Sequence, residues 1–242
     1  MIVNRQDEFF RFPHTPHLAW LGEGVPRDDK VLSEPEARLV LDAPIVVEEK
    51  LDGANLGFSI AASGGLQVQN RGSYIVKPFP GQFGLLRQWL ELHQDTLLAH
   101  LPDHVILFGE WCAARHSLGY SRLPDWFLVF DVYDRALGQF WSTSRRNALA
   151  ATLELPVVPS LLSGRTTKST LEHLLAQVKS NFYDGPLEGI VIRREDGEWL
   201  QARAKLVRPD FTQAIAAHWR SRRIEWNRRS FDTSASTERL DA

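Results

Sequence analysis

One lysine stands where an apolar stretch of the sequence runs into a glycine turn. In the segment Glu48-Glu49-Lys50-Leu51-Asp52-Gly53-Ala54-Asn55, Lys50 ends a predicted strand, Ile45 to Leu51, just before the turn. A lysine amine is a nucleophile only when neutral, and lowering its pKa from about 10.4 to about 7 requires roughly 4.6 kcal/mol. The two glutamates before Lys50 oppose this, so a nucleophilic Lys50 needs cations nearby. Taken alone, the octamer favours a surface lysine paired with glutamates, because short motifs recur by chance.

Further charged and aromatic residues occupy the ends of other predicted strands. The predicted strands after the octamer are Leu56 to Ala61, Leu66 to Arg71, His104 to Trp111, Trp126 to Tyr133, Leu187 to Arg194 and Trp199 to Val207. The strand-end residues are Glu48, Lys50, Arg71, Glu110, Phe130, Glu188, Arg203 and Lys205. Each has an ordinary alternative explanation: an aromatic in the core, a solvated carboxylate, or a basic residue that protects an edge strand. Their order along the chain is the stronger signal.

Side-chain alternation assigns these residues to faces. It places Val46, Glu48 and Lys50 on one face of the first strand, and Glu188, Ile190 and Ile192 on one face of a later strand. Arg203 and Lys205 likewise share a face. We therefore expect several charged side chains to meet on one side of a sheet.

The elements between the strands indicate the fold class. Helices are predicted from Gln82 to His100, from an N-cap at Ser144 through Leu153, from a capping box of Ser169 and Glu172 to about Val178, and from Phe211 onward. Residues 1–44 are rich in proline and predict an irregular lead-in with one helical turn near Glu36 to Val40. Because the strands come as hairpins, we predict an α+β fold of mainly antiparallel sheets with flanking helices.

Composition limits the possible classes of protein. With 242 residues, 43% of them hydrophobic, the chain can build a substantial core, and its net charge of -2 does not announce a polyanionic partner. The single cysteine, Cys112, excludes an internal disulfide framework. His14 and His17 lack a second pair of ligands for zinc. The longest apolar run is too short to span a membrane. We therefore expect a cytoplasmic protein without a membrane partner.

The C-terminal part is the one basic region. Between Arg203 and Arg229 there are eight Arg or Lys residues against Asp210 and Glu225. We divide the chain into a domain at 1–207 and a basic helix and tail at 208–242. On a continuous helix Phe211, Ile215, Trp219 and Trp226 form one packing stripe. The surrounding arginines, Arg220, Arg222, Arg223, Arg228 and Arg229, are expected to contact nucleic acid.

Six segments, taken in order, resemble the motifs of the covalent nucleotidyltransferase superfamily of ATP-dependent DNA ligases, RNA ligases and mRNA capping enzymes. They are Lys50-Leu51-Asp52-Gly53 with Asn55, Arg71, Phe108-Gly109-Glu110, Phe127 to Asp131, Glu188 to Ile192, and Arg203-Ala204-Lys205. Arg203 departs from the usual K-x-K pattern but keeps its charge. The stretch from Gly109 to Asp131, with Arg115-His116-Ser117 and Leu123-Pro124, resembles the RNA-ligase branch in particular.

The resemblance implies an ATP-grasp-like ligase fold and an ATP-dependent RNA ligase. Lys50 would attack the α-phosphate of ATP and carry AMP, which would pass to a 5′-phosphate and be displaced by a 3′-hydroxyl. The implied cofactors are ATP and Mg²⁺ (or Mn²⁺), and the implied partner is RNA. The implied catalytic residues are Lys50, Glu188, Lys205 and Arg203, with Glu188 also binding the metal. The implied nucleotide-binding residues are Glu48, Asp52, Gly53, Asn55, Arg71, Glu110 and Phe130.

Alternatives differ in what the pocket does. DNA ligases and capping enzymes add an OB-fold after the last motif, and only 37 residues follow Lys205, so we expect no OB-fold. A DNA-nick ligase and a non-catalytic nucleotide- or nucleic-acid-binding domain remain open. The physiological RNA or DNA, nicked or single-stranded ends, the oligomeric state, protein partners, and the roles of His116 and Tyr120 are not assigned.

Overall fold

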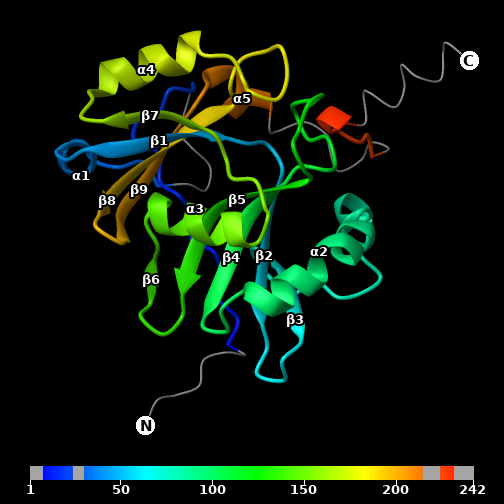
Figure 1. Cartoon of the computed structure of the whole chain (residues 1–242). Coiled ribbons are helices and arrows are strands. Elements are labelled where there is room, and N and C mark those ends of the chain that lie inside the picture. The colour runs from blue at the N-terminus through cyan, green and yellow to red at the C-terminus, as the bar shows by residue number, and fades with distance from the viewer. Residues whose placement is uncertain (1–7, 24–29, 215–223, 232–242) are drawn as a thin grey trace, which may run out of the picture.

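Two antiparallel sheets, packed against each other and flanked by helices, organise the chain (Figure 1). The computed structural model describes residues 8–23, 30–214 and 224–231. The four-stranded sheet has the order β7-β1-β8-β9 and the five-stranded sheet the order β3-β2-β4-β5-β6. The strands are β1 (Ile45–Lys50), β2 (Ala54–Ile60), β3 (Leu66–Asn70), β4 (Val105–Trp111), β5 (Phe127–Asp134), β6 (Gln139–Phe140), β7 (Ser160–Gly164), β8 (Gly189–Asp196) and β9 (Trp199–Val207). The predicted α+β class with mainly antiparallel sheets is confirmed.

The chain passes from one sheet to the other immediately after Lys50. β1 pairs with β7 and β8, whereas β2 pairs with β3 and β4. The Asp52-Gly53 turn is therefore a crossing between sheets and not a hairpin. Lys50 therefore lies at the junction of the two sheets, where side chains from both sheets can line one site.

Alternation sorts β1 into a core face and a polar face. Ile45 and Val47 join the core that α4 covers, together with Ile190 and Ile192 of β8. Glu48 and Lys50 lie on the opposite face, across from Val191 and Gly189 in the register of β8. The five-stranded sheet has its own larger core, into which α2 and α3 contribute Trp89 and Ala150.

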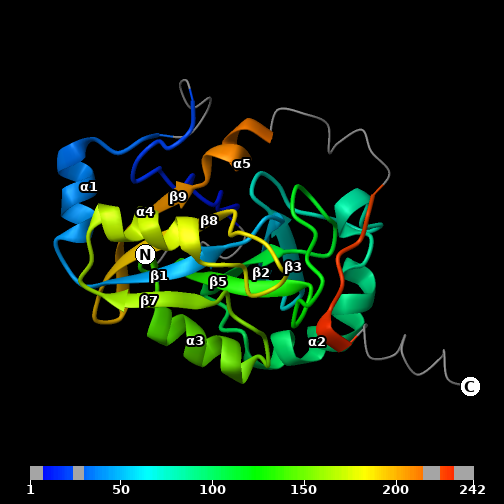
Figure 2. The ribbon, with the colours of Figure 1, turned by 90° about the horizontal axis from the view of Figure 1, so that it is seen from above.

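The helices flank the sheets on their outer sides. They are α1 (Glu34–Leu41), α2 (Leu86–His100), α3 (Thr143–Thr152), α4 (Lys168–Gln177) and α5 (Pro209–Ala214), with a 3₁₀ turn, η1 (Gly81–Phe83), before α2. Seen from above, α4 and α3 lie on opposite sides of β7 and β1 (Figure 2). No helix of the described residues is both long and apolar enough to cross a bilayer.

Two predicted helix caps are wrong by two residues. Ser142 caps α3 by accepting from Arg145 N, and Thr167 caps α4 by accepting from Thr170 N, so Ser144 and Ser169 lie inside the helices. In both cases the cap is the last residue with extended backbone angles, which a local sequence pattern does not locate. A capping box does occur, at Ser33 and Glu36 of α1.

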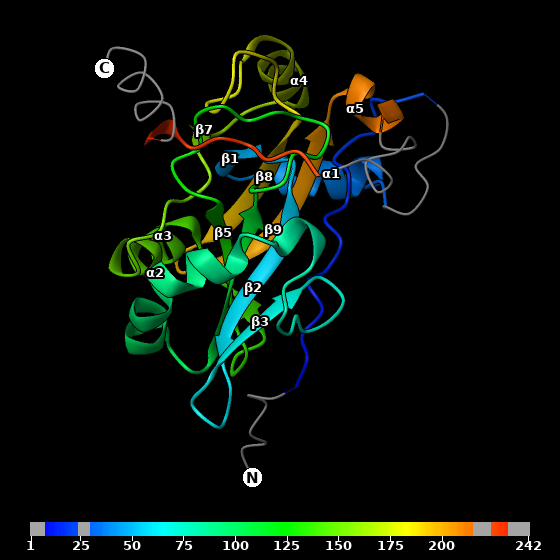
Figure 3. The same ribbon diagram turned by 90° about the vertical axis from the view of Figure 1, so that its right-hand side faces the viewer.

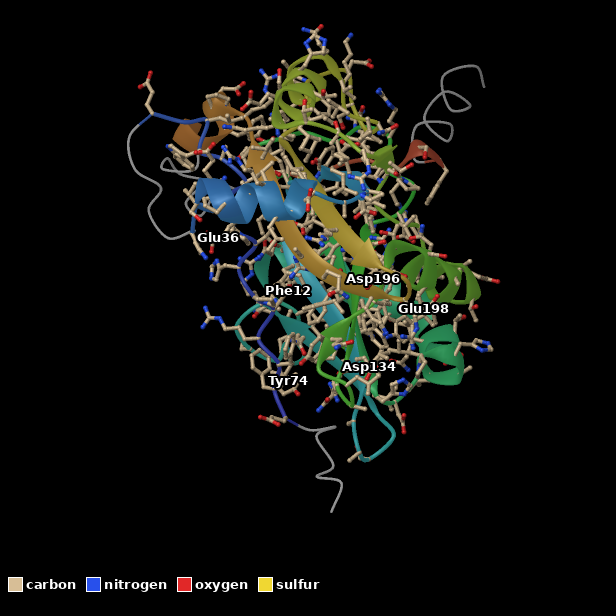
Figure 4. All side chains as sticks on the ribbon, turned by 90° about the vertical axis from the view of Figure 1, so that its left-hand side faces the viewer. Phe12, Glu36, Tyr74, Asp134, Asp196 and Glu198 are labelled. Carbon is tan, nitrogen blue, oxygen red and sulfur yellow. The ribbon has the colours of Figure 1, made fainter. Side chains whose placement is uncertain are left out.

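The N-terminal segment is more ordered than the predicted lead-in. Leu18 N donates to Lys205 O at 2.8 Å and Lys205 N donates to Pro16 O at 2.9 Å, so the segment runs along the edge of β9. In Figure 4, Phe12 lies on this segment beside the two sheets. The segment therefore forms part of the wall of the space between the two sheets.

The C-terminal part departs from the predicted single helix. Ile215, Trp219, Arg220, Arg222 and Arg223 lie outside the described residues. Trp226 lies in an extended segment whose backbone bridges to Ala114, so its placement on a helical stripe with Phe211 is wrong. Backbone hydrogen bonds to a distant loop replace those of a helix, and no local periodicity signals this. In Figure 3 the segment runs alongside that loop. Neither sheet closes into a barrel in the part of the chain that the structure describes.

Candidate active site

A pocket of about 430 Å³ opens where the faces of the two sheets meet. This volume lies within the range of roughly 300–1,000 Å³ that is typical of small-molecule sites. The predicted site residues that line it are Glu48, Lys50, Gly53, Asn55, Arg71, Glu110, Phe130 and Arg203. Asp52, Glu188 and Lys205 are not among its lining residues. β1, β2, β4, β5 and β9 thus each bring a predicted residue to one cavity.

Lys50 is bound by the carboxylate of Glu188, the residue directly before β8. Its Nζ donates to Glu188 Oε1 at 2.8 Å and to Oε2 at 2.9 Å. Burial lowers the pKa of Lys50, but Glu188, then Glu110 and Asp52, outweigh burial and hold the pKa above its usual range. The sequence indicates that a nucleophilic Lys50 needs cations nearby, from a bound metal or from basic side chains. The protein alone instead provides carboxylates that keep the proton on Lys50.

Two carboxyl groups near Lys50 titrate close to neutrality. Burial raises the pKa of Glu188 and of Glu110 from 4.5 to about 7, although the Lys50 ammonium opposes the shift in both. Glu110 Oε1 also accepts a hydrogen bond of 3.0 Å from Gly53 N. This end of the pocket therefore contains groups whose charge can change near pH 7.

Glu188 does not follow the predicted alternation. Ile190 and Ile192 enter the core, but the Glu188 side chain, which is predicted to share their face, turns to Lys50. The reason is that β8 begins at Gly189, so Glu188 precedes the pleat and is free to take another direction. Lys205, on β9, lowers the pKa of Glu188, which places its charge near the same group.

The turn after Lys50 is fixed to the loop at residues 112–123. Asp52 Oδ2 accepts from Ser117 N at 2.7 Å and from Leu118 N at 2.8 Å, and Asp52 N donates to Tyr120 Oη at 2.8 Å. A Cβ on Gly53 would lie 2.5 Å from Trp111 O, so only glycine fits there. The Asp52 carboxylate thus faces the loop, although the resemblance assigns it to nucleotide binding.

The opposite end of the pocket is built on two guanidinium groups that sequence reasoning missed. Arg146 of α3 is fully buried and donates to both Glu48 oxygens, at 3.1 and 2.6 Å, and to Phe130 O at 2.7 Å. Arg193 of β8 donates to Asp131 at 2.6 Å and to Phe130 O at 3.3 Å. Both guanidinium groups thus hold the backbone carbonyl of Phe130 in place. In the sequence, the local indication of Arg193 is that it lies two residues after Val191 and therefore on the same face of β8.

Arg203 belongs to this end and not to the Lys50 end. It is hydrogen-bonded to Asp131, and its guanidinium carbon lies 4.6 Å from the ring centre of Phe12 and 4.7 Å from that of Phe140. Burial lowers the Arg203 pKa, and Asp131 opposes that shift. The motif Arg203-Ala204-Lys205 thus serves two ends of the site.

Several buried polar atoms in the pocket wall have no hydrogen-bond partner among the described residues. Both amide atoms of Asn55 and the Nε of Arg71 are buried without a hydrogen bond. Because buried polar groups are nearly always paired, these atoms indicate a polar ligand. No group of three His, Cys, Asp or Glu side chains in the described ranges could hold a metal ion. Single carboxylates such as Glu188 fit Mg²⁺, which keeps water and phosphate oxygens as its other ligands.

The chain belongs to the RNA ligase family, whose model matches residues 43–207. Among solved structures it is similar to variants and complexes of Naegleria gruberi RNA ligase. A variant with ATP and Mn has a TM-score of 0.61 at 17% identity, over 86% of this chain and 59% of that one. The protein with PPi has a TM-score of 0.58 at 18% identity, over 86% and 64%.

A third structure, a variant with AMP and Mn, has a TM-score of 0.55 at 18% identity, over 85% of this chain and 64% of that one. At these identities the likeness establishes the fold. The chain spans about three fifths of the ligase chains that it matches. No curated protein matches it.

Proposed function

We propose that the chain is an ATP-dependent RNA ligase that forms a lysyl-AMP intermediate on Lys50 and joins 5′-phosphate to 3′-hydroxyl ends. The observation that carries this is the placement of Lys50 at the junction of two sheets, bonded to Glu188, in a pocket whose Asn55 and Arg71 atoms await a polar ligand. The RNA ligase family match supports it, as do the complexes of Naegleria RNA ligase with ATP, AMP and PPi.

The nucleotide fits this pocket in one direction. Phe130 offers a ring for stacking on adenine, on a backbone fixed by Arg146 and Arg193. The Glu48 carboxylate retains lone pairs beside its Arg146 bonds and can accept from the adenine amino group. Arg71 and Glu110 would bind the ribose and adjoining phosphate. The phosphates would then lie at the Lys50 end.

Lys50 must lose its proton before it attacks. A bound Mg²⁺ or Mn²⁺ would supply positive charge that stabilises the phosphates and draws Glu188 away from the amine. Glu188, with a pKa of about 7, would ligate that metal, and Lys205 would add positive charge nearby. Lys50 then forms a bond to the α-phosphorus, the bond to pyrophosphate breaks, and the amine proton passes to solvent.

The second half of the reaction concerns the nucleic acid. Lys50 would release AMP to an RNA 5′-phosphate, and a 3′-hydroxyl would displace it. Arg228 is a described member of the basic tail and is available for phosphate contacts, whereas the Arg229 guanidinium lies over the rings of Trp126 and Phe231, at 4.7 and 4.2 Å. The tail would therefore contribute to holding RNA.

Sealing assays test this function. The wild-type protein, ATP and Mg²⁺ are incubated with RNA and with DNA nicks of identical sequence, and the adenylylated protein and joined strands are measured separately. We expect label transfer from ATP to the protein and joining of RNA ends, both absent from Lys50→Ala. Joining of DNA alone would identify a DNA-nick ligase, and nucleotide binding without label transfer would identify a non-catalytic domain.

A further inference from the structure

An extended segment near the C-terminus lies across the loop that holds the nucleophile turn. We call residues 224–231 the strap. It pairs with the 112–123 loop through backbone bonds at both ends: Arg115 N donates to Glu225 O at 2.8 Å, and Ser230 N donates to Leu123 O at 2.9 Å. Figure 3 shows the strap running beside this loop. The strap is thus bound to a loop more than 100 residues earlier.

Asn227 is the buried centre of the strap. It is 5% exposed, and its side chain uses both of its polar atoms. Its Nδ2 donates to Cys112 O at 2.8 Å, and its Oδ1 accepts from Tyr120 N at 2.8 Å. The next strap residue, Arg228, donates its backbone N–H to Tyr120 O at 2.9 Å. The strap therefore holds Tyr120 by both its backbone N–H and its backbone C=O.

Tyr120 connects the strap to the site. Its side chain is 2% exposed, and its hydroxyl accepts from Asp52 N at 2.8 Å, two residues after Lys50. The loop also donates to the Asp52 carboxylate from Ser117 and Leu118. Because the turn crosses between sheets, no strand ladder fixes Asp52 itself, and the loop does so instead.

We propose that the strap is a positioning element for the nucleophile, and that Asn227 and Tyr120 are positioning residues acting on Lys50 through Asp52. The inference deepens the proposed function and rests on it. The direct contact of Tyr120 is a single hydrogen bond to the partly buried backbone N–H of Asp52, and Asn227 orients Tyr120. Loss of either would leave ATP contacts in place but broaden the range of positions that Lys50 samples.

The kinetic test separates positioning from nucleotide binding. Single-turnover adenylylation is measured against ATP concentration for Tyr120→Phe, which removes only a hydroxyl, and for Asn227→Ala. Both should lower the limiting rate about three- to tenfold, because both act on Lys50 through the single Tyr120–Asp52 hydrogen bond, with an unchanged half-saturating ATP concentration. Ser230→Ala is the matched control, because it removes a strap hydrogen bond to Leu123 O that does not involve Tyr120. It should leave the rate within about twofold of wild type.

A rate loss in Ser230→Ala equal to that in Asn227→Ala would overturn the proposal, as would a wild-type limiting rate in Tyr120→Phe. A readout without catalysis keeps the test independent of the proposed function. Hydrogen exchange of peptides covering residues 51–54 should be faster in Asn227→Ala than in wild type and unchanged in Ser230→Ala. Unchanged exchange in Asn227→Ala overturns the strap's role. A wild-type chain that never takes up AMP overturns only the proposed ligase function.

Discussion

The two ends of the pocket are built from different kinds of charge. At the Lys50 end, an amine faces Glu188 and Glu110, whose pKa values of about 7 allow their charge to change near neutrality. At the Phe130 end, Arg146 and Arg193 are fully buried guanidiniums that stay charged at any physiological pH. Groups that exchange protons suit bond making, whereas fixed charges suit the holding of a rigid binding surface. This difference supports the proposal that the chemistry takes place at the Lys50 end and nucleotide recognition at the Phe130 end.

Removing the amine should have the largest effect on activity. Lys50→Ala leaves nothing to bond phosphorus, so adenylylation should vanish completely while the protein stays folded, because Glu188 can take up a proton when it loses its partner. Label transfer from ATP and a urea unfolding curve measure the two quantities. Retained label transfer would move the chemistry away from this end.

Removing a fixed charge should have the largest effect on stability. Arg193→Met removes a buried guanidinium that pairs with Asp131 and Glu195 and leaves Asp131 with Arg203 alone, so the free energy of unfolding should fall by about 3 kcal/mol. Arg87→Met, at an exposed pair with Glu91, is the control and should cost less than about 0.5 kcal/mol. Urea denaturation compares the two. Similar costs would mean that the Phe130 end is not specially dependent on its guanidiniums.

The titratable end should give stability a pH dependence that a neutral side chain removes. The folded pKa of Glu110, about 7, lies above the ordinary 4.5, so the folded state binds this proton more tightly. That contribution is complete below pH 4.5 and is lost as the pH rises through 7. Glu110→Gln should therefore gain about 1–2 kcal/mol relative to wild type between pH 5 and 7.5.

Urea midpoints across this pH range provide the measurement, with Ser230→Ala as a control whose pH dependence should parallel that of wild type. If the pH dependence of the Glu110→Gln midpoint paralleled that of wild type, Glu110 would not be a group that changes its charge near neutrality.

Changes at the Phe130 end should alter the preference between nucleotides, and this effect should be smaller than the effects described above. Glu48→Gln replaces an acceptor by a side chain that can also donate to the oxygen of guanine, so preference for ATP over GTP should fall about tenfold. Phe130→Leu should weaken both nucleotides alike, because stacking does not distinguish the purines. Competition between labelled ATP and GTP measures the ratio. A ratio unchanged in Glu48→Gln would take base reading away from Glu48.

Local patterns predicted the parts of this site that lie on strands. Alternation located Glu48 and Lys50 on one face, and the ordered motifs gathered the residues that line the pocket. These signals work because strand periodicity and motif order are properties of short segments.

What the sequence did not show depends on contacts between distant segments. Arg146 and Glu48 are separated by 98 positions, and nothing near Arg146 indicates a buried ion pair. Phe12 lies in a segment without periodicity that gains its place only by docking on β9. Residue spacing predicts a helical position for Trp226, because spacing does not reveal that the Trp226 backbone pairs with Ala114. Tertiary pairing overrode local pattern at each position.

Peptide mapping by mass spectrometry tests the central claim most directly. The protein is incubated with ATP and Mg²⁺, digested, and searched for AMP on every lysine-containing peptide, with Lys50→Ala treated in parallel. The account predicts one adenylylated site, Lys50, at the end of the pocket that holds Glu188 and Glu110, and none in the variant. AMP on another lysine, or equal labelling of the variant, would contradict the assignment of chemistry to this end.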